Sequence, residues 1–153
     1  MLFDRDGTLV VDVPYNGDPS MVQPVQDARA CLDRLRAAEM RLGVVSNQSG
    51  IGRGTITSDQ VEAVNARIEA LLGPFDGWFI CPHAPEDDCR CRKPKPKLLL
   101  DAAMEFGVDP SACVFVGDKD EDVEAARNAG MRMLRVGSEC TLAQACDDVL
   151  AGG

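Results

Sequence analysis

Two aspartates, Asp4 and Asp6, lie one residue apart directly after the short apolar segment of residues 1–3. Side chains alternate between the two faces of a strand, so an extended backbone would place both carboxylates on one side. Gly7 then allows the chain to leave the strand sharply. Two carboxylates held together repel, so each must be neutralised by a cation or by a proton. The spacing therefore predicts a metal-ion site with acid–base or nucleophilic chemistry.

A second cluster of reactive side chains has the pattern C-x-H-x5-C-x-C and consists of Cys81, His83, Cys89 and Cys91. Reduced cysteines often pack in a core as small hydrophobic residues, and that interpretation suits Cys31. It does not suit this loop, which is rich in proline and charged residues. One imidazole and three thiolates form the closed tetrahedral ligand set of a structural Zn²⁺ site. The pattern therefore predicts a zinc ion that fixes the loop and takes no part in a reaction.

Residues 90–97 contain five basic side chains and no acidic one, in a chain whose net charge is −9. Such a run is often a solvated loop or a nucleic-acid patch. The overall negative charge argues against nonspecific binding of nucleic acid or of anionic membranes. A local positive run beside an acidic site would instead concentrate a small phosphorylated substrate. We therefore expect no nucleic-acid or membrane partner.

The elements that must position these residues are short apolar runs that alternate with helical patterns. The predicted helices cover residues 25–39, 57–72 and 96–106, a stretch that ends at residue 129, and residues 141–150. The predicted strands cover residues 1–3, 41–45, 77–80, 113–116 and 131–136. Thr57 and Gln60 have the spacing of a capping box. This alternation favours an α/β fold with a central parallel sheet between two helical layers, in which the polar turns at residues 4–8, 46–50 and 117–122 meet at the carboxyl edge.

The length of 153 residues predicts one domain, residues 1–153, with residues 81–91 as an inserted metal-binding loop. No segment between helices is long enough for a separate cap domain. No apolar stretch reaches membrane-spanning length, and no secretory signal is recognisable, so we expect a cytoplasmic protein with reduced thiols. Because the chain has no cap, a small site and no evident exposed apolar helix, we expect a monomer. Three residues precede Asp4, which predicts either a short first strand or a native start upstream of Met1.

The motifs together resemble those of the haloacid dehalogenase superfamily of phosphatases, which implies a Rossmann-like fold without a cap. The segment FDRDGTL is similar to the first motif and implies that Asp4 is a nucleophile and Mg²⁺ ligand. Asp6 would then be the general acid and base, with its carbonyl on Mg²⁺. Ser46 and Lys93 resemble the second and third motifs, which contact the phosphoryl group and balance charge. Asp118 resembles the fourth, which ligates Mg²⁺.

The zinc pattern and the stretch of residues 46–54 resemble a zinc-containing branch of that superfamily. This branch includes the D-glycero-D-manno-heptose 1,7-bisphosphate 7-phosphatases and the histidinol-phosphate phosphatases. Residues 46–54 are closer to the heptose enzymes, which implies removal of the 7-phosphate of the heptose bisphosphate. The candidate substrate-binding residues that follow are Asp12, Tyr15, Asn47, Gln48, Ser49, Arg53, Arg92 and Lys119.

Several alternatives stay open at this stage. Histidinol phosphate is the second candidate substrate, although Arg53 and Arg92 favour a substrate with a second phosphate. A polynucleotide 3′-phosphatase would share the motifs, but the acidic charge disfavours it. A zinc-stabilised binding module without activity would not need both Asp4 and Asp6. Tyr15 could pack within its loop and not contact a substrate.

Overall fold

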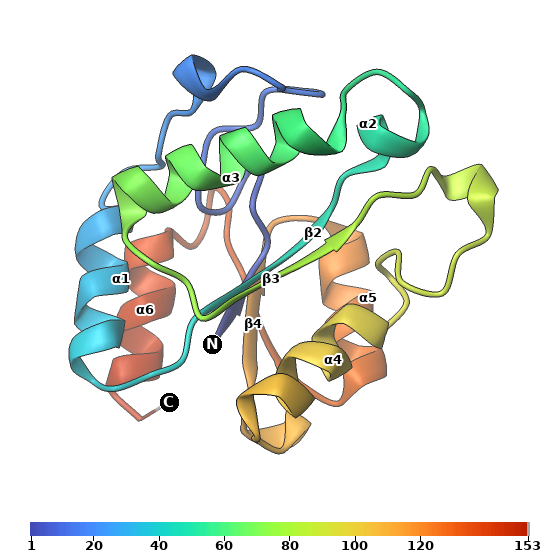
Figure 1. Ribbon diagram of the computed structural model, residues 1–153. Coiled ribbons are helices and arrows are strands. Elements are labelled where there is room, and N and C mark those ends of the chain that lie inside the picture. Colours follow the sequence, from blue (N-terminus) through green and yellow to red (C-terminus); the bar gives the residue numbers. More distant parts are fainter. Residues whose placement is uncertain (153) are drawn as a thin grey trace.

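The computed structural model describes residues 1–152 (Figure 1). Its centre is a five-stranded parallel sheet in the order β3-β2-β1-β4-β5. The strands are β1 Leu2–Phe3, β2 Gly43–Asn47, β3 Gly77–Cys81, β4 Val114–Gly117 and β5 Arg132–Arg135. Strand β1 has two residues, and both are buried between β2 and β4. The chain leaving β1 therefore emerges at the middle of the sheet's carboxyl edge.

Helices cover both faces of the sheet, which confirms the predicted three-layer α/β architecture (Figure 1). They are α1 Ala28–Ala37, α2 Ser49–Gly52, α3 Ser58–Leu72, α4 Lys97–Phe106, α5 Asp120–Ala129 and α6 Leu142–Leu150, with 3-10 turns at Pro19–Met21, Pro85–Asp87 and Pro110–Ala112. Helices α1, α3 and α6 pack on one face, and α4 and α5 on the other. Alternation along β1 directs Phe3 to the first face and Leu2 to the second.

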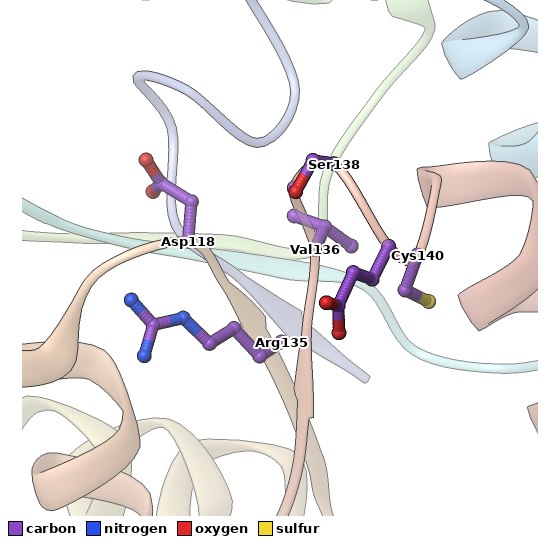
Figure 2. A pocket seen from close by; sticks show the side chains of 7 residues that line it. Asp118, Arg135, Val136, Ser138 and Cys140 are labelled. Carbon is purple, nitrogen blue, oxygen red and sulfur yellow. The ribbon is translucent and has the colours of Figure 1, made fainter.

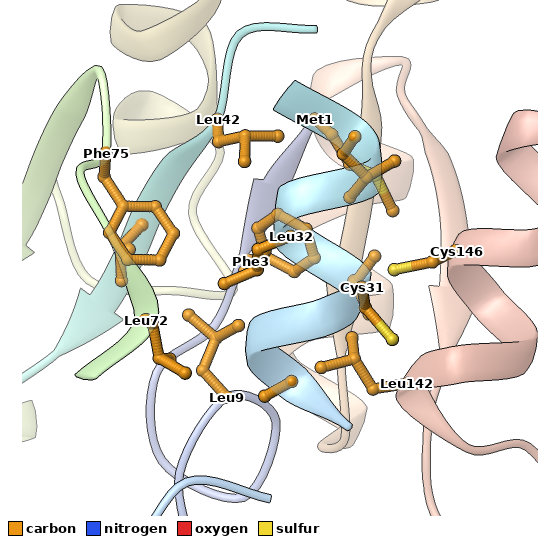
Figure 3. Close-up of a cluster of buried hydrophobic side chains, with 14 of the residues drawn as sticks. Met1, Phe3, Leu9, Cys31, Leu32, Leu42, Leu72, Phe75, Leu142 and Cys146 are labelled. Atoms are coloured by element: carbon orange, nitrogen blue, oxygen red, sulfur yellow. The ribbon is translucent and has the colours of Figure 1, made fainter. Parts of the chain in front are cut away.

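The larger apolar cluster anchors the start of the chain between the sheet, α1 and α6 (Figure 3). Phe3, Leu9 and Leu32 have no exposed surface. Burying one such side chain contributes about 1.5–3 kcal/mol. Because Phe3 and Leu9 flank the polar segment 4–8, the core holds that segment from both ends.

The helix predicted from Thr57 is confirmed as α3. Thr57 Oγ1 accepts from the Gln60 N–H at 3.1 Å, and Gln60 Oε1 accepts from the Thr57 N–H at 2.9 Å. The helix predicted at residues 25–39 is shorter, because Asp27 (φ 61°) and Glu39 (φ 59°) adopt left-handed backbone at its ends. No helix in residues 1–152 combines the length and apolar character needed to cross a membrane.

The polar turn predicted at residues 46–50 is wrong. Strand β2 continues through Ser46 to Asn47, because β3 pairs with it as far as Cys81. The short helix α2 then begins at Ser49. The expected polar side chains still lie at the sheet's carboxyl edge, since this strand end is part of that edge.

Candidate functional site

Lys93 joins two carboxylates at the centre of the carboxyl edge. It is 1% exposed, and its Nζ donates to Asp4 Oδ1 at 2.9 Å and to Asp122 Oδ1 at 2.7 Å. A third hydrogen bond goes to the carbonyl oxygen of Val45 at 2.9 Å. An ammonium group has three N–H donors, so all of them are occupied by the protein. In this arrangement Lys93 supplies positive charge and positions Asp4.

The charges at this point of the sheet do not balance. Burial raises the pKa of Asp4 to about 7, against the effect of Lys93 and with a further contribution from Asp122. Burial also lowers the pKa of Lys93, but the two carboxylates outweigh it and hold that pKa above its usual value. Lys93 pairs with two of the three clustered carboxyl groups, those of Asp4 and Asp122, and Asp118 lies beside them without a direct cationic partner. A divalent cation is the group that would neutralise the excess negative charge.

Asp4, Asp118 and Asp122 each offer an oxygen atom within 4.8 Å of the others. Asp122 is already committed, because its Oδ2 accepts from the N–H groups of Asp118 at 3.2 Å and Lys119 at 3.1 Å, and its Oδ1 binds Lys93. Asp4 and Asp118 keep oxygens without such a commitment. Hard carboxylate oxygens fit Mg²⁺, which takes one or two carboxylates, waters and a phosphate oxygen.

Gly7 leaves room for the carboxylate of Asp118. A Cβ atom at Gly7 would lie 2.4 Å from Asp118 Oδ2, and its φ of +82° lies in the region that favours glycine. We predict that Gly7→Ala displaces this carboxylate and raises the Mg²⁺ concentration needed for activity about 10- to 100-fold. The measurement is a Mg²⁺ titration of phosphate release.

The matched control for this variant is Gly54→Ala. Gly54 also has a positive φ, of +73°, but a Cβ there would meet nothing within 4 Å. The two variants share the backbone strain and differ in the contact with Asp118. Equal Mg²⁺ requirements for both would contradict the predicted role of Gly7.

The carboxylate of Asp6 lies apart from the three-carboxylate group. Gln48 Nε2 donates to Asp6 Oδ2 at 3.0 Å and to Ser46 Oγ at 2.7 Å, so one amide links the predicted acid to the predicted hydroxyl. Asp6 also pairs with the buried Arg5, whose Nε and Nη2 lie 3.1 Å from its carboxylate oxygens. Ser46 accepts from Gln48, which leaves the hydroxyl proton of Ser46 available to a ligand.

A cavity of about 210 Å³ opens above Asp6 and brings most of the predicted substrate residues together. Its lining includes Asp6, Asp12, Tyr15, Asn47, Gln48, Ser49 and Lys119. Burial lowers the pKa of Lys119, but Asp4, Asp12 and Asp118 outweigh that effect and raise it. An ammonium and several hydrogen-bonding groups around a small opening suit a small, polar, anionic ligand.

Arg53 and Arg92 do not line this cavity. Arg53 pairs with Glu86 at 3.6 Å, and Arg92 Nη1 donates to the carbonyl of His83 at 3.4 Å. Arg92 lines a separate hollow of about 370 Å³ beside Lys93 and Lys95. Both arginines border the cysteine–histidine loop, so their predicted contact with a second phosphate stays a prediction.

A larger hollow, of about 630 Å³, lies on the β5 side of Asp118 (Figure 2). Figure 2 shows Asp118 on one side of this hollow and the segment that carries Val136, Ser138 and Cys140 on the other. Arg135 also lines this hollow, but its guanidinium already pairs with Asp120 at 2.7 Å. Asp118, a predicted Mg²⁺ ligand, lines this space, whereas the predicted catalytic residues Asp4, Asp6, Ser46 and Lys93 do not.

Cys81, His83, Cys89 and Cys91 converge as the sequence predicts. Their four ligand atoms lie within 4.8 Å of one another. Cys89 Sγ lies 3.6 Å from Cys81 Sγ and 3.9 Å from Cys91 Sγ. Both distances are close to the sulfur–sulfur distance of about 3.8 Å expected for two thiolates bound to one Zn²⁺. The sulfur atoms of Cys91 and Cys81 are closer, at 2.9 Å. His83 Nδ1 lies 3.5 Å from Cys81 Sγ and 3.3 Å from Cys91 Sγ. The donor set fits a tetrahedral thiophilic ion.

The protonation of these thiols differs from one to the next. Burial raises the pKa of Cys81 to about 12. Burial has the same effect at Cys89, but the backbone N–H groups of Arg92 and Cys91 outweigh it and lower the pKa of Cys89 to about 7. Thiolates are the metal-binding form. Backbone donors therefore favour the ligating form of one cysteine before any ion binds.

Backbone hydrogen bonds brace the segment 47–52 against the cysteine–histidine loop. Gln48 N–H donates to the Cys81 carbonyl, and Gly52 N–H donates to the Pro82 carbonyl, both at 2.7 Å. The Asn47 side chain holds Lys93 by two bonds, from Nδ2 to the Lys93 carbonyl at 3.1 Å and from the Lys93 N–H to Oδ1 at 3.0 Å. Asn47 thus positions Lys93, and its predicted substrate contact stays a prediction.

Sequence reasoning did not single out Arg5 or the contact of Thr8. Thr8 Oγ1 donates to Asp118 Oδ1 at 3.3 Å, across 110 residues of chain. Arg5 is 1% exposed. Alternation places Arg5 on the opposite side of the chain from Asp4 and Asp6, and this was the signal that could have marked it as buried.

A parallel sheet covered by helices on both faces, with three carboxylates and a buried lysine at its carboxyl edge, defines an α/β domain with an acidic site that suits a divalent cation. The chain belongs to the haloacid dehalogenase-like hydrolase family, whose family model matches residues 13–130. This confirms the family indicated by the sequence motifs.

Relatives with assigned activities match most of the chain. A D-glycero-β-D-manno-heptose-1,7-bisphosphate 7-phosphatase of Pasteurella multocida is 37% identical over 142 residues, which cover 86% of this chain and 77% of that protein. The enzyme of the same name from Pseudomonas aeruginosa is 38% identical, with 83% and 74% covered. The crystal structure of a B. bronchiseptica D,D-heptose 1,7-bisphosphate phosphatase, complexed with magnesium and phosphate, has a TM-score of 0.87 at 26% identity and covers 100% of this chain and 98% of its own.

Proposed function

We propose that this protein is a Mg²⁺-dependent phosphatase that removes the 7-phosphate of D-glycero-D-manno-heptose 1,7-bisphosphate through an aspartyl-phosphate intermediate on Asp4. The observation that carries the proposal is the meeting of Asp4, Lys93 and Asp118 at the end of β1, beside the bridge between Asp6 and Ser46. The names of the relatives support the substrate.

Asp4 would attack phosphorus with a carboxylate oxygen, and the bond between phosphorus and the sugar oxygen would break. Asp6 would give its proton to the departing sugar oxygen, and in the second step it would take a proton from the water that hydrolyses the intermediate. The hydroxyl of Ser46 would donate to a phosphoryl oxygen. Lys93 would offset charge on Asp4 and position it, since its three donors are occupied.

Mg²⁺, held by Asp4, Asp118 and the carbonyl of Asp6, would supply charge neutralisation for the phosphoryl group. Asp122 would not bind Mg²⁺ itself but would position the ligands, because it binds Lys93 and the backbone N–H of Asp118. This assignment follows from the hydrogen bonds that already occupy both oxygens of Asp122.

The sugar would occupy the 210 Å³ cavity, where Asp12, Tyr15, Ser49 and Lys119 offer donors and acceptors. Asn47 and Gln48 line the same space. We propose that Arg53 and Arg92 bind the second phosphate, which requires Arg53 to exchange its exposed partner Glu86 for the substrate. A surface ion pair of this kind is weak, at about 0–1 kcal/mol, so the exchange is inexpensive. We further propose that the chain acts as a single-domain, cytoplasmic monomer without a nucleic-acid or membrane partner.

The test is a screen of the purified protein with Mg²⁺ over sugar bisphosphates, sugar monophosphates and histidinol phosphate. The proposal predicts the highest kcat/KM for the heptose bisphosphate, with release of one phosphate and retention of the 1-phosphate. A higher kcat/KM for histidinol phosphate would show that the heptose bisphosphate is not the preferred substrate and would assign histidinol phosphate in its place. Absence of Mg²⁺-dependent phosphate release from every substrate would overturn the enzymatic proposal.

We propose that Cys81, His83, Cys89 and Cys91 hold a structural Zn²⁺. Removing zinc with a chelator should lower the melting temperature, because the ion's binding energy contributes to folding. It should also lower activity, because the loop braces residues 48–52 and precedes Lys93. The measurement is metal analysis, melting temperature and kcat before chelation, after it, and after zinc is restored.

The matched control for this prediction is Cys113→Ser compared with Cys91→Ser. Both replace a thiol by a hydroxyl, but Cys113 lies outside the four-residue cluster. Only Cys91→Ser should lose zinc. A chelated protein with unchanged melting temperature and activity would rule out the structural role.

A further inference from the structure

Arg5, which lies between Asp4 and Asp6 in the sequence, has a buried guanidinium that binds Asp6. Its Nε lies 3.1 Å from both carboxylate oxygens of Asp6, and its Nη2 lies 3.1 Å from Asp6 Oδ2. Its Nη1 donates to Asn65 Oδ1 at 2.9 Å. Asp6 is itself 20% exposed at the side chain, so one face of its carboxylate remains open to the cavity.

Asn65 stands on the inward face of α3, where apolar residues dominate. Val61, Val64 and Ile68 on that face are at most 3% exposed, and Asn65 lies four residues after the first and three before the last. Residues three and four apart share one side of a helix. A polar group on such a face is costly unless it is hydrogen-bonded. The amide oxygen of Asn65 is bonded to Arg5, which lies 60 residues earlier in the chain.

We propose that Asn65 is a positioning residue for Asp6 and acts through Arg5. This inference rests on the proposed function, in which Asp6 protonates the leaving oxygen. A guanidinium that meets a carboxylate with two N–H groups fixes the plane of that carboxylate. The long side chain of Arg5 needs an anchor of its own, and Asn65 supplies one from a rigid helix.

The second support of Asp6 is Gln48, which follows the neighbouring strand β2 and donates to Oδ2. Gln48 also binds Ser46, so this support belongs to the phosphoryl side of the site. Arg5, anchored by Asn65 of α3, contacts both oxygens of the Asp6 carboxylate. The reacting proton must lie within hydrogen-bond reach of the leaving oxygen. Small displacements of a catalytic group cost as much as 100-fold in rate, so loss of one support should be measurable.

The experiment compares two leaving groups with different needs for protonation. A sugar phosphate releases an alkoxide unless Asp6 supplies a proton, whereas p-nitrophenyl phosphate releases a stable phenolate without one. For Asn65→Leu we expect kcat/KM to fall about 10- to 100-fold on the sugar bisphosphate, a part of the 10²–10⁴ that general acids contribute. On p-nitrophenyl phosphate we expect kcat/KM to stay within about twofold of the unmodified protein. An equal fall on both substrates would mean a structural role and would overturn the inference.

Two further variants at the same position keep the test decisive. Asn65→Asp retains an oxygen acceptor for Arg5 and should recover most of the activity on the sugar bisphosphate. Asn65→Ser removes the acceptor with a smaller side chain, and it should show the same selective loss if the leucine variant does not fold. Arg67→Leu, at an exposed position of the same helix, is the control and should leave kcat/KM unchanged on both substrates.

Asp6→Asn separates failure of this inference from failure of the proposed function. If Asp6→Asn lowers kcat/KM on the sugar bisphosphate selectively and Asn65→Leu does not, the acid role of Asp6 stands and the role of Asn65 is refuted. If Asp6→Asn leaves kcat/KM unchanged on both substrates, Asp6 is not the general acid, and the proposed mechanism itself is wrong. Selective loss in both variants is the result we expect.

Discussion

Asp4→Asn should reduce Mg²⁺-dependent phosphate release by about 10⁴-fold or more, as expected when a nucleophile is removed. An amide oxygen is a poor nucleophile and carries no charge for a cation. The amide can still accept a hydrogen bond from Lys93, which lies 2.9 Å from Asp4 Oδ1. The variant should therefore keep the shape of the site while losing its chemistry. The measurement is kcat on the heptose bisphosphate together with the melting temperature.

Stability distinguishes this outcome from misfolding. Burial raises the pKa of Asp4 to about 7, so in metal-free protein its ionised form is unfavourable in the fold. A raised carboxyl pKa means that stability is lost as pH rises from about 4 to about 7. Asp4→Asn removes this cost and should be at least as stable as the unmodified protein at pH 8 without metal. Asp59→Asn, at an exposed position of α3, is the matched control and should retain full activity. Wild-type turnover by Asp4→Asn would exclude Asp4 as the nucleophile.

Lys93→Met should lower both stability and activity. Removing one partner of a buried ion pair typically costs about 3–5 kcal/mol, because the remaining charges are left uncompensated. Here two carboxylates, those of Asp4 and Asp122, would lose their common cation. We expect kcat to fall about 10²- to 10³-fold, the range for loss of one electrostatic contact at a reacting group. Denaturant unfolding and kcat measure the two effects.

Two comparisons identify the cause of that loss. Lys97→Met changes an exposed lysine that pairs with Asp101 on the surface of α4, so its effect on unfolding should stay below about 1 kcal/mol. Adding Asp122→Asn to Lys93→Met removes one of the stranded carboxylates and should restore part of the stability without restoring activity. Unchanged stability and activity in Lys93→Met would contradict the buried charge network.

Local signals predicted much of the fold. The capping residues Thr57 and Gln60 marked the start of α3, and Gly107 and Gly130 ended α4 and α5 with left-handed backbone. The boundary of β2 was missed because its last residues are polar. Pairing with β3 keeps Ser46 and Asn47 extended, and such pairing depends on a strand that follows much later in the chain.

The sequence predicted the site residues whose positions follow from sheet topology. It missed those that are brought together only by side-chain contacts between distant parts of the chain. The carboxyl ends of parallel strands meet, so Asp4, Ser46 and Asp118 were expected to be close. The cysteine–histidine loop was predictable from ligand types and spacing alone. The bond between Arg5 and Asn65 was not, because it joins a strand end to the middle of a helix. A polar residue among the inward apolar positions of α3 was the signal that the sequence offered.

The central claim, a phosphoryl group carried by Asp4, is tested most directly by trapping the intermediate. The Asp6→Asn variant should react with p-nitrophenyl phosphate in the first step and stall in the second, because it lacks the base that activates water. Acid quenching and borohydride reduction would convert an aspartyl phosphate at position 4 to homoserine, which peptide mapping detects by mass. We predict homoserine at position 4, and none when Asp4→Asn is also present. The account would be contradicted if Asp6→Asn released a burst of nitrophenolate while Asp4 stayed unmodified. It would also be contradicted if the homoserine appeared at another position.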